Sequence, residues 1–184
     1  MMTKEQADRW SRPVEQLVYA TNQQHAPLVE PTLVALETSV MNQDVVKAAL
    51  IAVSKALRKM GVGSAEFCFF DRKVRESIPF VLDSLIEGTV ANVMETVEFG
   101  AAPGALLDYL LRFAPGIEGT AFVPVFEHAR KLGAKTVYVV TDMLGHDLDR
   151  IPEELRPPAT IWVALFAERG PTRPFGWKVE FPHA

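Results

Sequence analysis

The sequence has little of what marks secreted, membrane-bound or disulfide-rich proteins. Its one cysteine, Cys68, among 184 residues cannot form an internal disulfide, so nothing indicates an oxidising compartment. No apolar stretch reaches the ~20 residues that a membrane-spanning helix requires, and no apolar signal-peptide core follows the first residues. We therefore expect a cytoplasmic protein that does not bind a membrane.

The sequence also lacks a strong excess of either acidic or basic residues. Lys and Arg number 19 and Asp and Glu 23, which gives a formal net charge of −4, and neither sign forms a long run. This balance argues against nucleic acid as the main partner. Apolar residues make up 48% of the chain and charged residues 23%, values typical of a globular domain.

Common nucleotide, zinc and serine-hydrolase motifs are absent. The run Gly61-Val62-Gly63-Ser64 lacks the lysine of a phosphate-binding loop, and no G-x-G-x-x-G follows a predicted strand. The sequence has no His-Glu-x-x-His, no paired cysteines and no G-x-S-x-G. Cys68 stands among phenylalanines, which indicates a small buried apolar residue.

Four short apolar runs predict buried β-strands. They are residues 33–36, 67–70, 137–140 and 161–166. Each is continuous rather than alternating, as in a parallel sheet covered by helices on both faces.

Segments with helical periodicity separate these runs. Apolar residues recur every three or four positions from Val45 to Met60 and from Phe122 to Leu132, and a glycine follows each helix. Thr120 is placed to cap the second helix. Helices are also expected near residues 6–21 and, in two pieces, over 81–116.

The order of these elements predicts an α/β fold that is Rossmann-like, with a mostly parallel sheet flanked by helices. We divide the chain into an N-terminal helical extension, 1–31, and an α/β domain, 32–184, with a helical insertion at about 81–116. Trp10 and Trp177 lie near the chain ends, where an aromatic side chain either anchors a partner or packs against the sheet edge.

Polar residues gather where the predicted strands end. Glu37 and Ser39 follow the first strand, Thr120 precedes a helix, and Asp142 follows the third strand. The carboxyl ends of parallel strands share one edge of a sheet, so these side chains are expected to converge. Their oxygens are the ligands that Mg²⁺ takes. In the alternative interpretation, Ser39 and Thr120 cap helices, Asp142 starts a turn, and backbone N–H groups hold Glu37.

The order of several short motifs resembles von Willebrand factor A (VWA) domains. The closer resemblance is to the VWA-like domain at the C-terminus of a family of bacterial proteins classed as metallopeptidases. It covers roughly residues 32–80 and 119–181, and the zinc motif of that family's peptidase half is not found here. The matching runs are Glu118-Gly119-Thr120-Ala121-Phe122-Val123-Pro124-Val125-Phe126-Glu127, Val140-Thr141-Asp142, Pro157-Pro158, Ile161-Trp162-Val163 and Pro174-Phe175-Gly176.

The resemblance implies a metal-ion-dependent adhesion site that has degenerated. Ser39, Thr120 and Asp142 match the family's ligand types, Glu37 stands in place of an aspartate, and Met41 replaces a serine. A thioether is a poor ligand for Mg²⁺, and a longer carboxylate disturbs its octahedral geometry. Ala121 also replaces the aspartate that follows the family's threonine. Glu37, Ser39, Thr120 and Asp142 are therefore expected to form a weakened Mg²⁺ site.

These observations favour a non-catalytic protein-interaction module. The resemblance implies a role as an adaptor for an AAA+ ATPase of the MoxR type or as part of a larger assembly. The alternative is a metal-dependent phosphoester hydrolase that uses the carboxylates of Glu37 and Asp142, with His146, on a bound cation. A structural component that forms a defined homo-oligomer is a third possibility.

Overall fold

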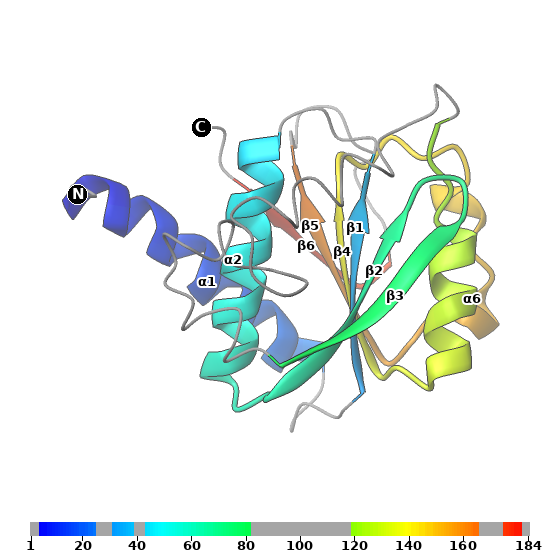
Figure 1. Cartoon of the computed structure of the whole chain (residues 1–184), viewed down its shortest axis with the longest axis horizontal. Helices are drawn as coiled ribbons and strands as arrows, with labels where there is room; N and C mark the ends of the chain where they lie inside the picture. Colours follow the sequence, from blue (N-terminus) through cyan, green and yellow to red (C-terminus); the bar gives the residue numbers. More distant parts are fainter. Residues whose placement is uncertain (1–3, 25–30, 39–42, 82–118, 166–174, 182–184) are drawn as a thin grey trace.

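A computed structural model describes residues 4–24, 31–38, 43–81, 119–165 and 175–181 (Figure 1). Ser39, Met41 and the two helices expected beyond Val81 lie outside the described residues. The described part holds a six-stranded sheet with the order β3-β2-β1-β4-β5-β6. The strands are β1 (Thr32–Glu37), β2 (Ser64–Phe70), β3 (Val74–Val81), β4 (Thr136–Thr141), β5 (Ala159–Ala164) and β6 (Trp177–Glu180).

The sheet is mostly parallel, as the continuous apolar runs predicted. β1 pairs in parallel with both β2 and β4, and β5 pairs in parallel with β4 and β6. Every residue of β1, β4 and β5 is buried. This confirms the general α/β class, with β1 and β4 at the centre of the sheet.

The strand β3 is a feature that the sequence did not reveal. It pairs antiparallel with β2 and lies at the edge of the sheet. Its residues mix charged, polar and apolar types and include Pro79, which an edge strand tolerates because one side of it needs no ladder hydrogen bonds.

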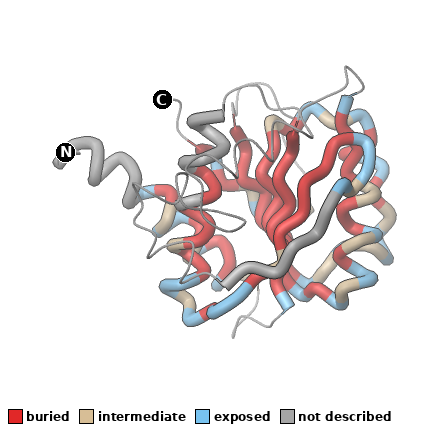
Figure 2. Tube along the Cα trace, viewed as in Figure 1, coloured by how far each residue is buried: buried red, intermediate tan, exposed pale blue. Residues whose placement is uncertain are grey.

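Helices cover both faces of the sheet. Figure 1 shows α1 (Lys4–Gln24) and α2 (Gln43–Lys59) on one side and α6 (Val123–Leu132) on the other. Alternate residues of each central strand enter one of two apolar clusters. In β1, Val34 and Leu36 face α1 and α2, whereas Leu33 and Ala35 face α6. Figure 2 shows these buried strands between the helices.

Glycine ends the two predicted helices as expected. Gly133 has a φ of 68° in the left-handed region, and its N–H donates to the carbonyl of Arg130, one of the last carbonyls of α6. Gly61, with a φ of 83°, follows α2 in the same way.

The helix α1 is joined to the α/β core by its C-terminal half. Leu17 is fully buried, and the hydroxyl groups of Thr21 and Tyr138 are hydrogen-bonded at 2.6 Å. The amide oxygen of Gln24 accepts the backbone N–H of Thr160 at 3.0 Å. Neither α1 nor any other helix in the described residues combines the length and apolar character needed to cross a bilayer.

Cys68 is completely buried in β2, as its phenylalanine neighbours indicated. Burial, with a smaller contribution from the charge of Glu66, raises the pKa of its thiol to about 12. The thiolate, which is the reactive form of cysteine, is therefore scarce at neutral pH.

Candidate functional site

The centre of the sheet provides a natural binding position. After β1 the chain continues to β2 and β3 on one side, and it later returns to β4 on the other side of β1. In open α/β sheets, ligands bind outside the carboxyl ends of the strands where the strand order reverses in this way. Glu37 is the last residue of β1, and Thr141 is the last residue of β4.

Glu37 is a buried carboxylate held by groups from two other segments. Its side chain accepts hydrogen bonds from the hydroxyl of Thr120 on Oε1 and from the hydroxyl of Thr141 on Oε2. The backbone N–H of Asp142 also donates to Oε2, at 3.3 Å. Only 3% of Glu37 is exposed, and a buried carboxylate is costly unless such donors surround it. We call Glu37, Thr120, Thr141 and Asp142 the Glu37 cluster.

The chain after β4 forms a tight turn beside this cluster. The N–H of Met143 donates to the Thr141 hydroxyl oxygen, and the N–H of Leu144 donates to Asp142 Oδ1, both at 2.9 Å. The expectation that Asp142 starts a turn is therefore confirmed. Met143 is buried with a left-handed φ of 67°, whereas 53% of Leu144 is exposed. The turn thus exposes the side chain of Leu144 to solvent, while hydrogen bonds hold the backbone that carries it.

A residue that sequence reasoning missed caps the helix α6. The carboxylate of Asp147 accepts the backbone N–H groups of Phe122 and Val123, at 2.8 and 2.9 Å. The prediction that Thr120 caps this helix is wrong. The helix begins at Val123, and the Thr120 hydroxyl is donated to Glu37 instead. Asp147 lies 24 or more residues away in sequence from the N–H groups that it accepts, so no local pattern identifies it.

Hydrogen bonds also tie the end of β2 to the cluster. The N–H of Thr38 donates to the carbonyl of Phe70, and the N–H of Ala121 donates to the carbonyl of Asp71, both at 2.9 Å. Burial raises the pKa of Asp71, but hydrogen bonds from the Arg75 guanidinium and from nearby backbone N–H groups outweigh it. The pKa therefore lies below its ordinary value, so Asp71 is ionised near neutral pH.

Three of the four predicted site residues lie together. Glu37, Thr120 and Asp142 converge at the carboxyl edge of the sheet, while Ser39 lies outside the described residues. The backbone interpretation of Glu37 is correct only in part, because the hydroxyls of Thr120 and Thr141 donate to its carboxylate as well as the N–H of Asp142. Thr141 was missed, although it stands in the Thr-Asp pair that ends β4.

The described residues do not fit a self-sufficient Mg²⁺ site. Both oxygens of Glu37 already accept hydrogen bonds, and Oδ1 of Asp142 accepts the N–H of Leu144. No group of three His, Cys, Asp or Glu side chains in the described part of the chain is arranged to hold a metal ion. Mg²⁺ needs near-octahedral oxygen ligation, which these residues do not supply.

No protein-family model and no curated protein sequence matches this chain. The geometry of the Glu37 cluster is therefore the basis for assigning a function.

Proposed function

We propose that this protein is a VWA-like interaction module that binds a partner protein through the carboxyl edge of β1 and β4 and does not perform catalysis. The observation that carries the proposal is the convergence of Glu37, Thr120 and Asp142. These residues come from three distant segments, and they occupy the positions at which the VWA resemblance places metal ligands.

The sheet topology supports the same proposal. Its strand order is that of a common doubly wound fold, and the Glu37 cluster lies where the order reverses. The one antiparallel strand, β3, lies at the edge of the described sheet and does not pair with β1 or β4. The carboxyl ends of β1 and β4 therefore have the parallel arrangement at which doubly wound folds bind ligands.

In this proposal, hydrogen bonds replace the metal ion. Two hydroxyl groups and one N–H direct their positive ends at the Glu37 carboxylate, and this compensates the buried charge without a cation. The longer side chain of Glu37, compared with the family's aspartate, lets it reach both Thr120 and Thr141. The adhesion site has thus become a metal-independent structural support for the surrounding loops.

Divalent cations are expected to leave thermal stability almost unchanged. A cation at a hundredfold excess over its dissociation constant stabilises the folded state by about 2.7 kcal/mol, which corresponds to roughly 5–10 °C in a chain of this size. We expect chelator-treated protein to melt within about 1 °C of protein in millimolar Mg²⁺ or Mn²⁺. Differential scanning calorimetry measures this. A rise of several degrees that disappears in Asp142→Asn would show a working metal site.

The turn after β4 supplies a contact surface for the partner. Leu144 is exposed, whereas its neighbour Met143 is buried and its own N–H is bound to Asp142. An apolar side chain on a fixed backbone loses little conformational entropy when a partner covers it. Asp142 beside it is only half-buried, so the same surface offers a carboxylate oxygen.

Following the resemblance, the partner is an AAA+ ATPase of the MoxR type or a component of a larger assembly. The test is capture of proteins from an extract of the source organism, using wild-type protein and two variants as bait, in buffer with chelator. Asp142→Arg changes the proposed surface. Glu154→Arg makes a similar charge change at an exposed position just before β5, near the opposite edge of the sheet.

The expected result is one ATPase or assembly protein that is bound by wild type and by Glu154→Arg. Its recovery should fall at least about tenfold with Asp142→Arg, as for a residue at the centre of an interface. Melting temperatures establish that both variants fold. Equal recovery with Asp142→Arg would place the interface elsewhere. Turnover of phosphoester substrates in Mn²⁺ would instead favour the hydrolase alternative.

A further inference from the structure

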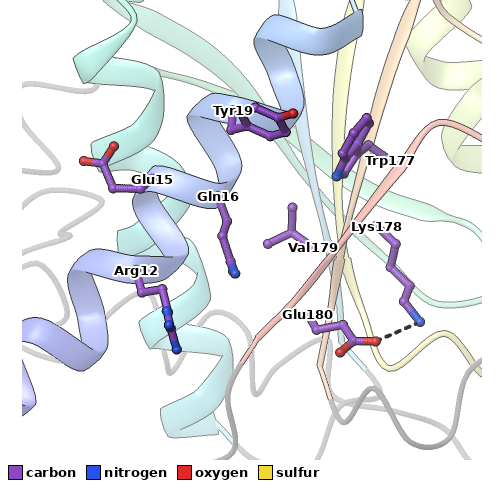
Figure 3. Close-up of a pocket in the computed structure, with 8 residues that line it drawn as sticks. All are labelled: Arg12, Glu15, Gln16, Tyr19, Trp177, Lys178, Val179 and Glu180. Carbon is purple, nitrogen blue, oxygen red and sulfur yellow. Dashed lines mark ion pairs between the residues drawn. The ribbon is translucent and has the colours of Figure 1, made fainter.

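A groove between α1 and β6 is a second candidate binding site, separate from the Glu37 cluster. Its volume is about 540 Å³, within the range of ligand-binding pockets. The residues that line it are Arg12, Glu15, Gln16, Tyr19, Trp177, Lys178, Val179 and Glu180 (Figure 3).

The two walls of the groove have matching lengths. On α1, Arg12, Gln16 and Tyr19 are spaced by four and three residues, so they share one helix face that extends about 10 Å. On β6, the three steps from Trp177 to Glu180 also extend about 10 Å. Figure 3 shows the aromatic residues at one end, Arg12 and Glu180 toward the other, and Gln16 with Val179 between them.

One end of the groove is aromatic and open to solvent. Tyr19 is 57% exposed and Trp177 is 39% exposed. Their rings meet edge to face, with centroids 5.8 Å apart and an interplanar angle of 78°. Two exposed rings held at this angle form a surface against which a compact apolar ring, such as that of proline, packs.

The other end of the groove carries the guanidinium of Arg12, for which the described side chains supply no ion-pair partner. Glu15 is paired with Lys59, and Glu180 is paired with Lys178 at 3.3 Å. Among the residues whose side chains the structure describes, no carboxylate forms an ion pair with Arg12. An occupant that complements this end carries a carboxylate.

We propose that this groove binds an extended, proline-rich peptide of a partner protein, with a carboxylate about three residues from the proline that packs on Tyr19 and Trp177. A polyproline II segment rises about 3.1 Å per residue, so three residues extend about 9 Å, close to the length of the groove. Such a peptide loses little entropy on binding, because it is already extended when free.

The test is a titration of the ¹⁵N-labelled full chain with the blocked peptide acetyl-Pro-Pro-Ala-Ala-Asp-amide. NMR spectra record the chemical shift of the Trp177 indole N–H at each peptide concentration. We expect saturable shifts at this group. Two matched peptides serve as controls: one ends in Asn instead of Asp, and the other has both prolines replaced by alanine. Both should bind more weakly than the first.

Variants separate the two ends of the groove. Tyr19→Ala should weaken binding at least about tenfold. Arg12→Gln should weaken binding about two- to fivefold and make the Asp and Asn peptides equal in affinity. Arg130→Gln, on the exposed side of α6, should change nothing. The proposal fails if the indole N–H signal of Trp177 does not move at millimolar peptide, or if the wild-type protein binds the Asp and Asn peptides with equal affinity. It also fails if Arg130→Gln weakens binding as much as Arg12→Gln.

Discussion

Replacement of Glu37 by leucine is expected to lower the free energy of unfolding by about 3–5 kcal/mol. Leucine fills the space near the backbone but is one bond shorter than glutamate and cannot accept hydrogen bonds. The hydroxyls of Thr120 and Thr141 and the N–H of Asp142 would then lose their buried acceptor. Each unsatisfied buried donor costs about 1–3 kcal/mol. Urea denaturation followed by circular dichroism measures the change.

A double variant separates this explanation from loss of packing. Glu37→Leu combined with Thr120→Val removes the acceptor together with one of its hydroxyl donors, and it keeps the Thr141 hydroxyl that accepts the N–H of Met143. One buried donor fewer is then left unsatisfied. The double variant should therefore be more stable than Glu37→Leu alone. If it is instead less stable by the sum of the two single changes, the hydrogen bond between Thr120 and Glu37 does not contribute the stability assigned to it.

Replacement of Trp162 by alanine is expected to cost about 3–5 kcal/mol of unfolding free energy. Trp162 is fully buried in β5, and its ring contacts those of Phe122, Phe126 and Phe175, with centroids 5.4 to 5.7 Å away. Its Nε1–H also donates to the carbonyl of Phe175 at 2.6 Å. Alanine would leave a large cavity between β5 and α6 and an unsatisfied carbonyl. Thermal and urea denaturation both measure the loss.

Two substitutions provide controls for the Trp162 prediction. Trp162→Phe keeps most of the ring contacts and loses the Nε1–H donor, so it should cost only about 1–3 kcal/mol. Trp177→Ala removes the same type of side chain from an exposed position and should cost less than about 1 kcal/mol. If Trp162→Ala and Trp177→Ala destabilise the protein equally, the aromatic cluster around β5 does not have its assigned role.

The sequence by itself determined the local elements of this fold. The continuous apolar runs of β1, β4 and β5 required burial on both faces, and the structure buries all their residues. Helical periodicity together with a following glycine located α2 and α6, because these signals act over neighbouring residues. The position of Glu37 and Asp142 at strand ends was also sufficient to predict their convergence, since parallel strands share a carboxyl edge.

Only the tertiary structure decided which donors and acceptors pair across that edge. Threonine and aspartate side chains can both accept the N–H groups at the start of a helix. The fold places Thr120 beside Glu37 and places Asp147 at the start of α6, so Asp147 caps the helix. The edge strand β3 was missed for a related reason. Within the described sheet it pairs with β2 alone, so its sequence needs no strong apolar pattern. The groove of Tyr19 and Trp177 likewise exists only because the packing of α1 brings together residues from opposite ends of the chain. Such pairings depend on distances between segments far apart in sequence, which local periodicity does not encode.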